Sequence, residues 1–116
     1  MNHELGVLPR ILLVCGILGL SGCGNPEPVV KIGFVGPLTG DQAPQGQDML
    51  RGSQLAIEHA NAQGPILPGV RLELVALDDQ HNPTQAVAAA KRLVADPHVA
   101  AVVGHLNSSC TMPASA

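Results

Sequence analysis

Aromatic side chains are almost absent from this chain of 116 residues, since Phe34 is the sole aromatic residue and neither tyrosine nor tryptophan occurs. The chain therefore has little with which to stack on a nucleic-acid base or to build an apolar wall around a ligand by itself. Lysine and arginine are few and scattered, and the formal net charge is −3. This charge pattern argues against nucleic acid as a partner. The hydrophobic content of 46% and charged content of 13% indicate a globular segment and not a disordered one.

Cysteine is also scarce, and two of the three cysteines lie in or beside an amino-terminal targeting segment. Residues 11–20 form an apolar stretch that follows Arg10 and precedes small residues, which is the layout of a secretory signal peptide. The stretch is too short for a permanent transmembrane helix. The motif Leu20-Ser21-Gly22-Cys23 that follows resembles a bacterial lipoprotein box, in which cleavage leaves the cysteine as an acylated first residue.

These features predict residues 1–22 as a lipoprotein signal peptide and residues 23–28 as a lipidated, proline-stiffened tether. The protein is then expected outside the cytoplasm, either in the periplasm or on the outer face of the cytoplasmic membrane, held there by lipid on Cys23. Cys15 leaves with the signal peptide, so Cys110 is the remaining free thiol and no internal disulfide can form. Because no catalytic partner accompanies Cys110, we predict a packing role for it.

The rest of the sequence alternates between short apolar runs and amphipathic helical patterns. Residues 29–35, 71–77 and 99–103 are predicted strands, and the first of them has the near-continuous apolar run of a strand covered on both faces. Two helical patterns separate the strands. The apolar or small positions of the first are Met49, Ser53, Ala56, Ile57 and Ala60, and those of the second are Ala86, Val87, Ala90, Leu93 and Val94. This order predicts an α/β fold with a parallel, doubly wound sheet.

Local signals give the expected ends of these helices. Residues 38–46 are rich in Gly, Pro, Asp and Gln and are predicted to form a turn, after which Asp48 stands where a negative charge favours a helix start. Gly64-Pro65 is expected to end this first helix. In the second helix, Asn82 is the predicted cap and Pro83 the first residue. Asp96-Pro97 is expected to end that helix.

The turn after the last predicted strand is the most informative feature of the chain. An apolar run breaks at Gly104 into a hydroxyl-rich segment with Ser108, Ser109 and Thr111, which leads toward a new helix. Open α/β sheets bind ligands at the carboxyl ends of their strands, and unpaired N–H groups at a helix start suit a carboxylate. The sequence therefore predicts a small-molecule site here. The alternative is that the hydroxyl groups only cap the new helix.

Several motifs, in order along the chain, resemble those of the leucine/isoleucine/valine-binding protein family, the type I periplasmic solute-binding proteins of branched-chain amino acid ABC transporters. These motifs are VKIGFVGPLTG at residues 30–40, NAQG at 61–64, DDxxNPxQAV at 78–87 and VGHLxSSxTxPAS at 103–115. The resemblance implies that residues 29–116 are the amino-terminal part of a leucine-binding-protein-like domain. The complete fold would have two α/β lobes that close around the ligand. The implied partners are ABC permease subunits and an amino acid or amide ligand, without a cofactor.

The resemblance also implies the residues of the site. The serine that matches Ser108 takes the ligand's α-carboxylate in that family, and the residue that matches Leu106 lies beside its apolar side chain. Asn107 and Gln45 are the other expected ligand-binding residues. Family members often have an aromatic residue at the position of Gln45 and a cysteine pair at the positions of His81 and Asn107. Because this chain departs at all three, the ligand stays open among branched-chain amino acids, amides, urea-like solutes and aromatic acids.

A metal-dependent hydrolase is the main alternative from another class of protein. Asp78, Asp79 and His81, joined by His98 or His105, are residue types that bind divalent metals. We favour the simpler interpretation that the acidic residues cap the turn after their strand, because no zinc-hydrolase motif and no nucleophile elbow occurs. The sequence therefore predicts no enzymatic activity and no metal. A ligand-sensing receptor of a signalling system is the other alternative, and it stays open beside transport.

Overall fold

The computed structural model describes residues 27–64 and 68–116. The predicted signal peptide, Cys23 and most of the predicted tether lie outside the described residues. Three strands alternate with three helices: β1 (Val29–Gly36), α1 (Ala43–Ala62), β2 (Arg71–Asp78), α2 (Pro83–Val94), β3 (Val99–Gly104) and α3 (Ser108–Ala114). No helix within residues 27–64 and 68–116 has the length and apolar character needed to cross a membrane.

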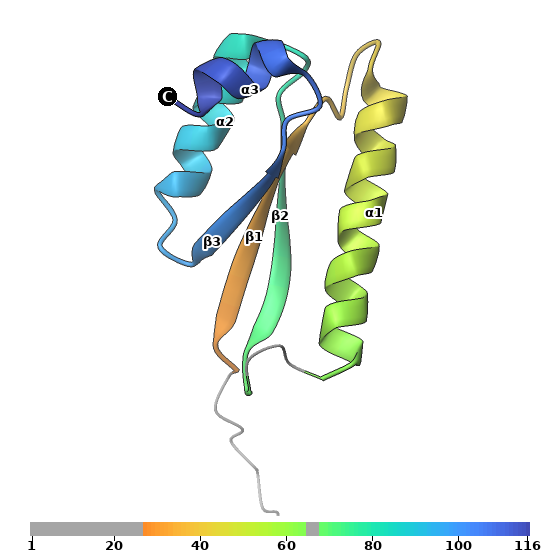
Figure 1. Ribbon diagram of the computed structural model, residues 1–116, viewed down its shortest axis with the longest axis vertical. Helices are drawn as coiled ribbons and strands as arrows, with labels where there is room; N and C mark the ends of the chain where they lie inside the picture. Colours follow the sequence, from red (N-terminus) through yellow and green to blue (C-terminus); the bar gives the residue numbers. More distant parts are fainter. Residues whose placement is uncertain (1–26, 65–67) are drawn as a thin grey trace, which may run out of the picture.

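The strands form one parallel sheet in the order β2-β1-β3, with β1 in the centre. Helix α1 covers one face of the sheet, whereas α2 covers the other and α3 lies beside α2 (Figure 1). The predicted parallel, doubly wound α/β fold is therefore confirmed. Each strand ends one residue later than predicted, at Gly36, Asp78 and Gly104.

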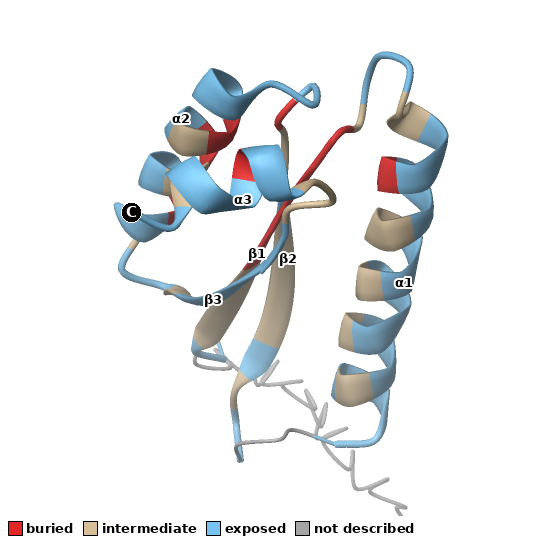
Figure 2. Cartoon of the chain, turned by 45° about the horizontal axis from the view of Figure 1, so that its top comes forward, coloured by how far each residue is buried: buried red, intermediate tan, exposed pale blue. Residues whose placement is uncertain are grey.

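The core lies along the second half of β1, where residues 33–36 are all buried (Figure 2). Successive side chains of a strand point to opposite faces. Val35 packs with Ala89 and Leu93 of α2, so the fully buried Phe34 lies on the face that α1 covers. The apolar run of β1 therefore supplies both layers of the core, as the sequence predicts for a central strand.

Helix α1 begins earlier than predicted. Pro44 lies in its first turn, where the fixed φ of proline fits and its missing N–H is not needed. Asp48 lies further along the helix and pairs with Arg51, so the predicted role of Asp48 at the helix start is wrong. At the other end Gln63 follows the last residue, and Gly64 has a φ of +99°. The expected stop at Pro65 lies outside the described residues.

Gly46 explains why the helix can run through the segment that was predicted to be a turn. It is the buried residue of α1 and lies against the segment that follows β1. A Cβ atom at this position would lie 1.9 Å from the carbonyl oxygen of Pro37. Glycine therefore allows the close approach that brings the start of α1 to the end of β1.

Helix α2 begins as predicted. The side chain of Asn82 accepts hydrogen bonds from the N–H groups of Thr84, at 2.8 Å, and Gln85, at 3.2 Å, and Pro83 is the first helical residue. The helix ends at Val94, just before the predicted stop at Asp96-Pro97.

Replacing Gly46 with alanine should destabilise the protein. The expected loss for Gly46→Ala in the full-length protein is about 1–3 kcal/mol of unfolding free energy, the usual cost of an extra methyl group in a packed site. Gly52→Ala is the matched control, because no atom lies within 4 Å of a Cβ there. It should gain about 1 kcal/mol from the better helix propensity of alanine. Urea unfolding followed by circular dichroism measures both, and equal effects would contradict the close-approach explanation.

Candidate functional site

The three parallel strands end at one edge of the sheet, so the segments that follow them lie together there (Figure 1). We define the carboxyl edge as residues 37–42 after β1, residues 79–82 after β2 and residues 105–107 after β3. This is the edge at which open α/β sheets bind ligands. Hydrogen bonds between side chains and backbone groups connect all three segments.

Asp78, at the end of β2, holds the segment after β1. Its carboxylate accepts hydrogen bonds from the N–H of Leu38, at 2.8 Å, the hydroxyl of Thr39, at 2.5 Å, and the N–H of Gln80, at 2.9 Å. Desolvation by burial raises the pKa of Asp78, but the hydrogen bond from the Thr39 hydroxyl and those from backbone N–H groups lower it further, so the net pKa is below the ordinary value. The expectation that acidic residues cap the turn here is confirmed.

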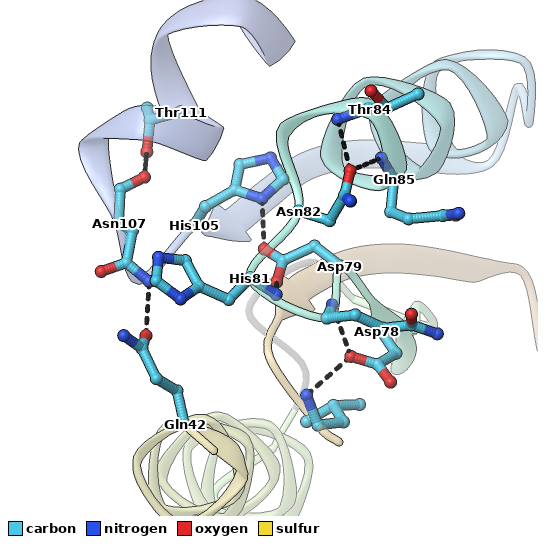
Figure 3. Close-up of polar contacts among 12 residues, drawn as sticks. Gln42, Asp78, Asp79, His81, Asn82, Thr84, Gln85, His105, Asn107 and Thr111 are labelled. Carbon is cyan, nitrogen blue, oxygen red and sulfur yellow. Dashed lines mark hydrogen bonds and ion pairs between the residues drawn. The ribbon is translucent and has the colours of Figure 1, made fainter. Parts of the chain in front are cut away.

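Asp79 connects the segments after β2 and β3. One carboxylate oxygen lies 2.8 Å from Nδ1 of His105, and the other accepts the N–H of His81 at 2.9 Å (Figure 3). The side chains of Asp79 and His105 are only 1% and 6% exposed. This buried pair is the deepest polar contact of the carboxyl edge. The turn around it closes through the N–H of Asn82, which donates to the backbone carbonyl of Asp79 at 2.8 Å.

Asn107 connects the segment after β3 with the start of α1. Its side-chain Nδ2 donates to Oε1 of Gln42 at 2.6 Å (Figure 3). The backbone carbonyl of Asn107 accepts the N–H groups of Cys110 and Thr111, both at 3.0 Å, and thereby begins α3. The helix predicted after this turn is therefore present. Its cap residue is Asn107, whose side chain makes no capping bond.

The predicted ligand-binding residues fall at or beside this edge. Leu106 and Asn107 are half-buried, and Ser108 is exposed as the first residue of α3. Gln45 is exposed in the first turn of α1, and the glutamine that contacts Asn107 is Gln42. Gln42 was not among the residues predicted for this site. Its place just before a helix that opens with proline was the available signal. The roles of these residues toward a ligand stay predictions.

Cys110 has the packing role predicted for it. Its side chain is fully buried in α3. Desolvation by burial and the nearby negative charge of Asp79 raise the pKa of the thiol, against a smaller opposite effect of a hydrogen bond with Ser109. The protonated thiol is thus the favoured form, and it is a weak nucleophile.

Of the residues named for the metal-hydrolase alternative, the structure brings Asp79 and His105 together but not His98. His98 lies before β3, at the opposite edge of the sheet from Asp78 and Asp79, and its Nδ1 lies 3.1 Å from Oδ1 of Asp96. In the part of the chain that the structure describes, no three His, Cys, Asp or Glu side chains lie close enough to hold one metal ion. The oxygens of Asp78 and Asp79 instead accept hydrogen bonds from the segments of the carboxyl edge.

Comparison with known proteins agrees with this architecture. Residues 29–116 match the family model of the periplasmic binding proteins. An amino acid binding protein of Pseudomonas aeruginosa is 45% identical over 104 residues, which cover 90% of this chain and 27% of that protein. The leucine-, isoleucine-, valine-, threonine-, and alanine-binding protein of the same species is 39% identical over 93% of this chain and 28% of its own length. The chain therefore spans little more than a quarter of the length of these relatives.

Solved structures are similar over the same region. The branched-chain amino acid transporter substrate binding protein LivJ of Streptococcus pneumoniae, in complex with isoleucine, has a TM-score of 0.68 and 34% identity, covering 74% of this chain and 24% of that one. A fatty acid ABC transporter substrate-binding protein of Thermomonospora curvata has a TM-score of 0.69 and 28% identity, covering 79% and 23%. With the family model matching residues 29–116, the chain belongs to the periplasmic binding protein family.

Proposed function

We propose that this chain is part of the solute-binding component of an ABC transporter, and that the ligand is a branched-chain amino acid or a closely related small solute. The observation that carries the proposal is the place of Ser108, which is exposed directly beside the carboxyl edge. The names of the relatives, which include amino acid and leucine-binding proteins, support the ligand class.

The turn at residues 106–108 offers both kinds of contact that an apolar amino acid needs. The hydroxyl of Ser108 can donate a hydrogen bond to the ligand's carboxylate, and such a bond is strong because the acceptor carries a charge. The half-buried side chain of Leu106, two residues earlier, offers apolar surface. A polar and an apolar contact on one short turn orient the ligand as well as hold it.

The remaining contacts require a longer chain. Since these residues correspond to little more than a quarter of the relatives, we take residues 29–116 as the amino-terminal part of one lobe in a two-lobed protein. The ligand would lie between the lobes, and closure of the second lobe would exclude water from it. The permease subunits of the transporter are the protein partners in this proposal.

Export and lipid anchoring through Cys23 are part of the same proposal. The apolar stretch at residues 11–20 and the lipoprotein-like box after it support them. Anchoring would keep the binding protein close to its permease. It would thereby raise the effective concentration of each for the other.

Removing the hydroxyl of Ser108 should weaken ligand binding. The expected loss for Ser108→Ala in the full-length protein is about 1.5–3 kcal/mol, or roughly ten- to hundredfold in affinity, because one charge-assisted hydrogen bond is lost. Isothermal titration calorimetry with leucine, isoleucine and valine measures it, and acetamide, urea, phenylalanine and a fatty acid extend the panel. Ser115→Ala is the matched control, because Ser115 lies at the other end of α3.

Two results of this titration contradict the proposal in different ways. Equal affinity of the wild type and Ser108→Ala would remove this serine from the site. No binding of any amino acid by the wild type would contradict the proposed ligand class, and a fatty acid or amide that binds instead would name the replacement.

Replacing Cys23 should prevent lipid anchoring. In Cys23→Ala, the sulfur that carries the lipid is absent, so we expect an unprocessed precursor mass and loss of the acylated form. Cys15→Ala is the matched control, because this cysteine lies inside the apolar stretch and should leave processing unchanged. Intact-protein mass spectrometry and membrane fractionation measure both variants. A Cys23→Ala protein with the same modified mass and membrane partition as the wild type would contradict the anchor.

A further inference from the structure

We propose that Asp79, His105 and Gln42 are positioning residues, which hold the turn at residues 106–108 in its binding geometry without touching the ligand. The proposal rests on the function proposed for that turn. It names the groups on which the affinity of the Ser108 site depends.

The first contact that constrains the turn is the buried pair of Asp79 and His105. Both backbone groups of Asp79 are hydrogen-bonded, since its N–H donates to the carbonyl of Gly36 at 3.0 Å and its carbonyl accepts the N–H of Asn82 at 2.8 Å. One oxygen of its carboxylate accepts the N–H of His81 at 2.9 Å. The other carboxylate oxygen lies 2.8 Å from the ring of His105. A carboxylate that is 1% exposed is costly to bury unless such partners surround it. The imidazole of His105, the residue directly before Leu106, therefore contacts a carboxylate that is itself constrained by hydrogen bonds.

The second contact that constrains the turn is the amide pair of Gln42 and Asn107. Each residue occupies the cap position of a helix, Gln42 before α1 and Asn107 before α3, and neither side chain caps its own helix. A capping bond from an asparagine typically stabilises a helix by about 1 kcal/mol. Here the two side chains bond to each other instead, at 2.6 Å. The pair thus ties the start of α3 to the start of α1.

The entry to the turn is also constrained. Gly104 has a φ of +133°, which side chains disfavour. A Cβ atom on Gly104 would lie 2.0 Å from the carbonyl oxygen of Val35. The backbone therefore enters the turn pressed against β1. Because Gly104, His105 and Asn107 are all constrained, the backbone that carries Ser108 is held close to one conformation.

Losing either of these contacts should lower the affinity for the ligand because Ser108 is no longer kept in place. When a turn samples several arrangements, the measured affinity falls in proportion to the fraction of time spent in the competent one. A residue that only stabilises the fold would change affinity, if at all, independently of Ser108. A positioning residue should have a much smaller effect once the hydroxyl that it positions has been removed, because only the weaker contact of Leu106 is then left for it to position.

A double-mutant cycle in the full-length protein tests this distinction. Gln42→Ala and His105→Gln are each made in the wild type and in Ser108→Ala, and calorimetry with leucine measures the affinity of every variant. We expect each single variant to bind about tenfold more weakly than the wild type, which corresponds to a turn that is in its competent arrangement about a tenth of the time. Added to Ser108→Ala, each should weaken binding less than about twofold further. His98→Gln is the matched control, because it breaks the other Asp–His pair, at the opposite edge of the sheet, and should leave affinity unchanged.

The possible results separate the two proposals. If Gln42→Ala and His105→Gln weaken binding as much in Ser108→Ala as in the wild type, the positioning roles are overturned. Unchanged affinity in the two single variants would overturn them as well. Both results would leave Ser108 in the site. Unchanged affinity in Ser108→Ala itself would overturn both proposals. If His105→Gln fails to fold, as its thermal melt would show, Gln42→Ala decides the question alone, because its bond is only half-buried.

Discussion

Parallel pairing of the strands is the constraint on which the candidate site depends. Strands that run in one direction end at one edge, so the segments after them meet there whatever their separation in sequence. The register fixes this meeting, because Gly36 pairs with Asp78 in β2 and Val35 pairs with Gly104 in β3. Gln42 and Asn107, which are 65 positions apart in the sequence, thereby come within hydrogen-bond distance.

Two adjacent aspartates at the end of β2 connect it to the segments that follow β1 and β3. Adjacent side chains at a strand end point to opposite sides. Asp78 accepts bonds from the segment after β1, whereas Asp79 reaches past the end of β1 to His105. Each carboxylate has one partner in its own segment and at least one in another segment, and these contacts offset the cost of removing it from water. The pair of acidic residues that could have indicated a metal site is thus used to join loops.

The elements that could be predicted correctly are those whose signal in the sequence is local. The strands follow from apolar runs, and the start of α2 follows from Asn82, whose side chain caps the two N–H groups that a cap residue normally reaches. The start of α1 was wrong because Gly46 is a turn residue by propensity. Its role as a packing contact with Pro37 exists only in the folded chain. Gln42 was missed for the same reason, since its partner is distant in the sequence.

The side chains that order the carboxyl edge are bonded within the chain before any ligand binds. Ordering a loop at the moment of binding weakens affinity, and a loop already ordered by folding avoids that cost. Here the side chains that order the edge, Asp78, Asp79 and Gln42, already have partners within the chain. Ser108, which directly follows the carboxyl edge, is exposed. The groups that shape the edge are therefore separate from Ser108, the group that we propose to contact the ligand. A ligand contact at Ser108 would not require any of the edge's own hydrogen bonds to break.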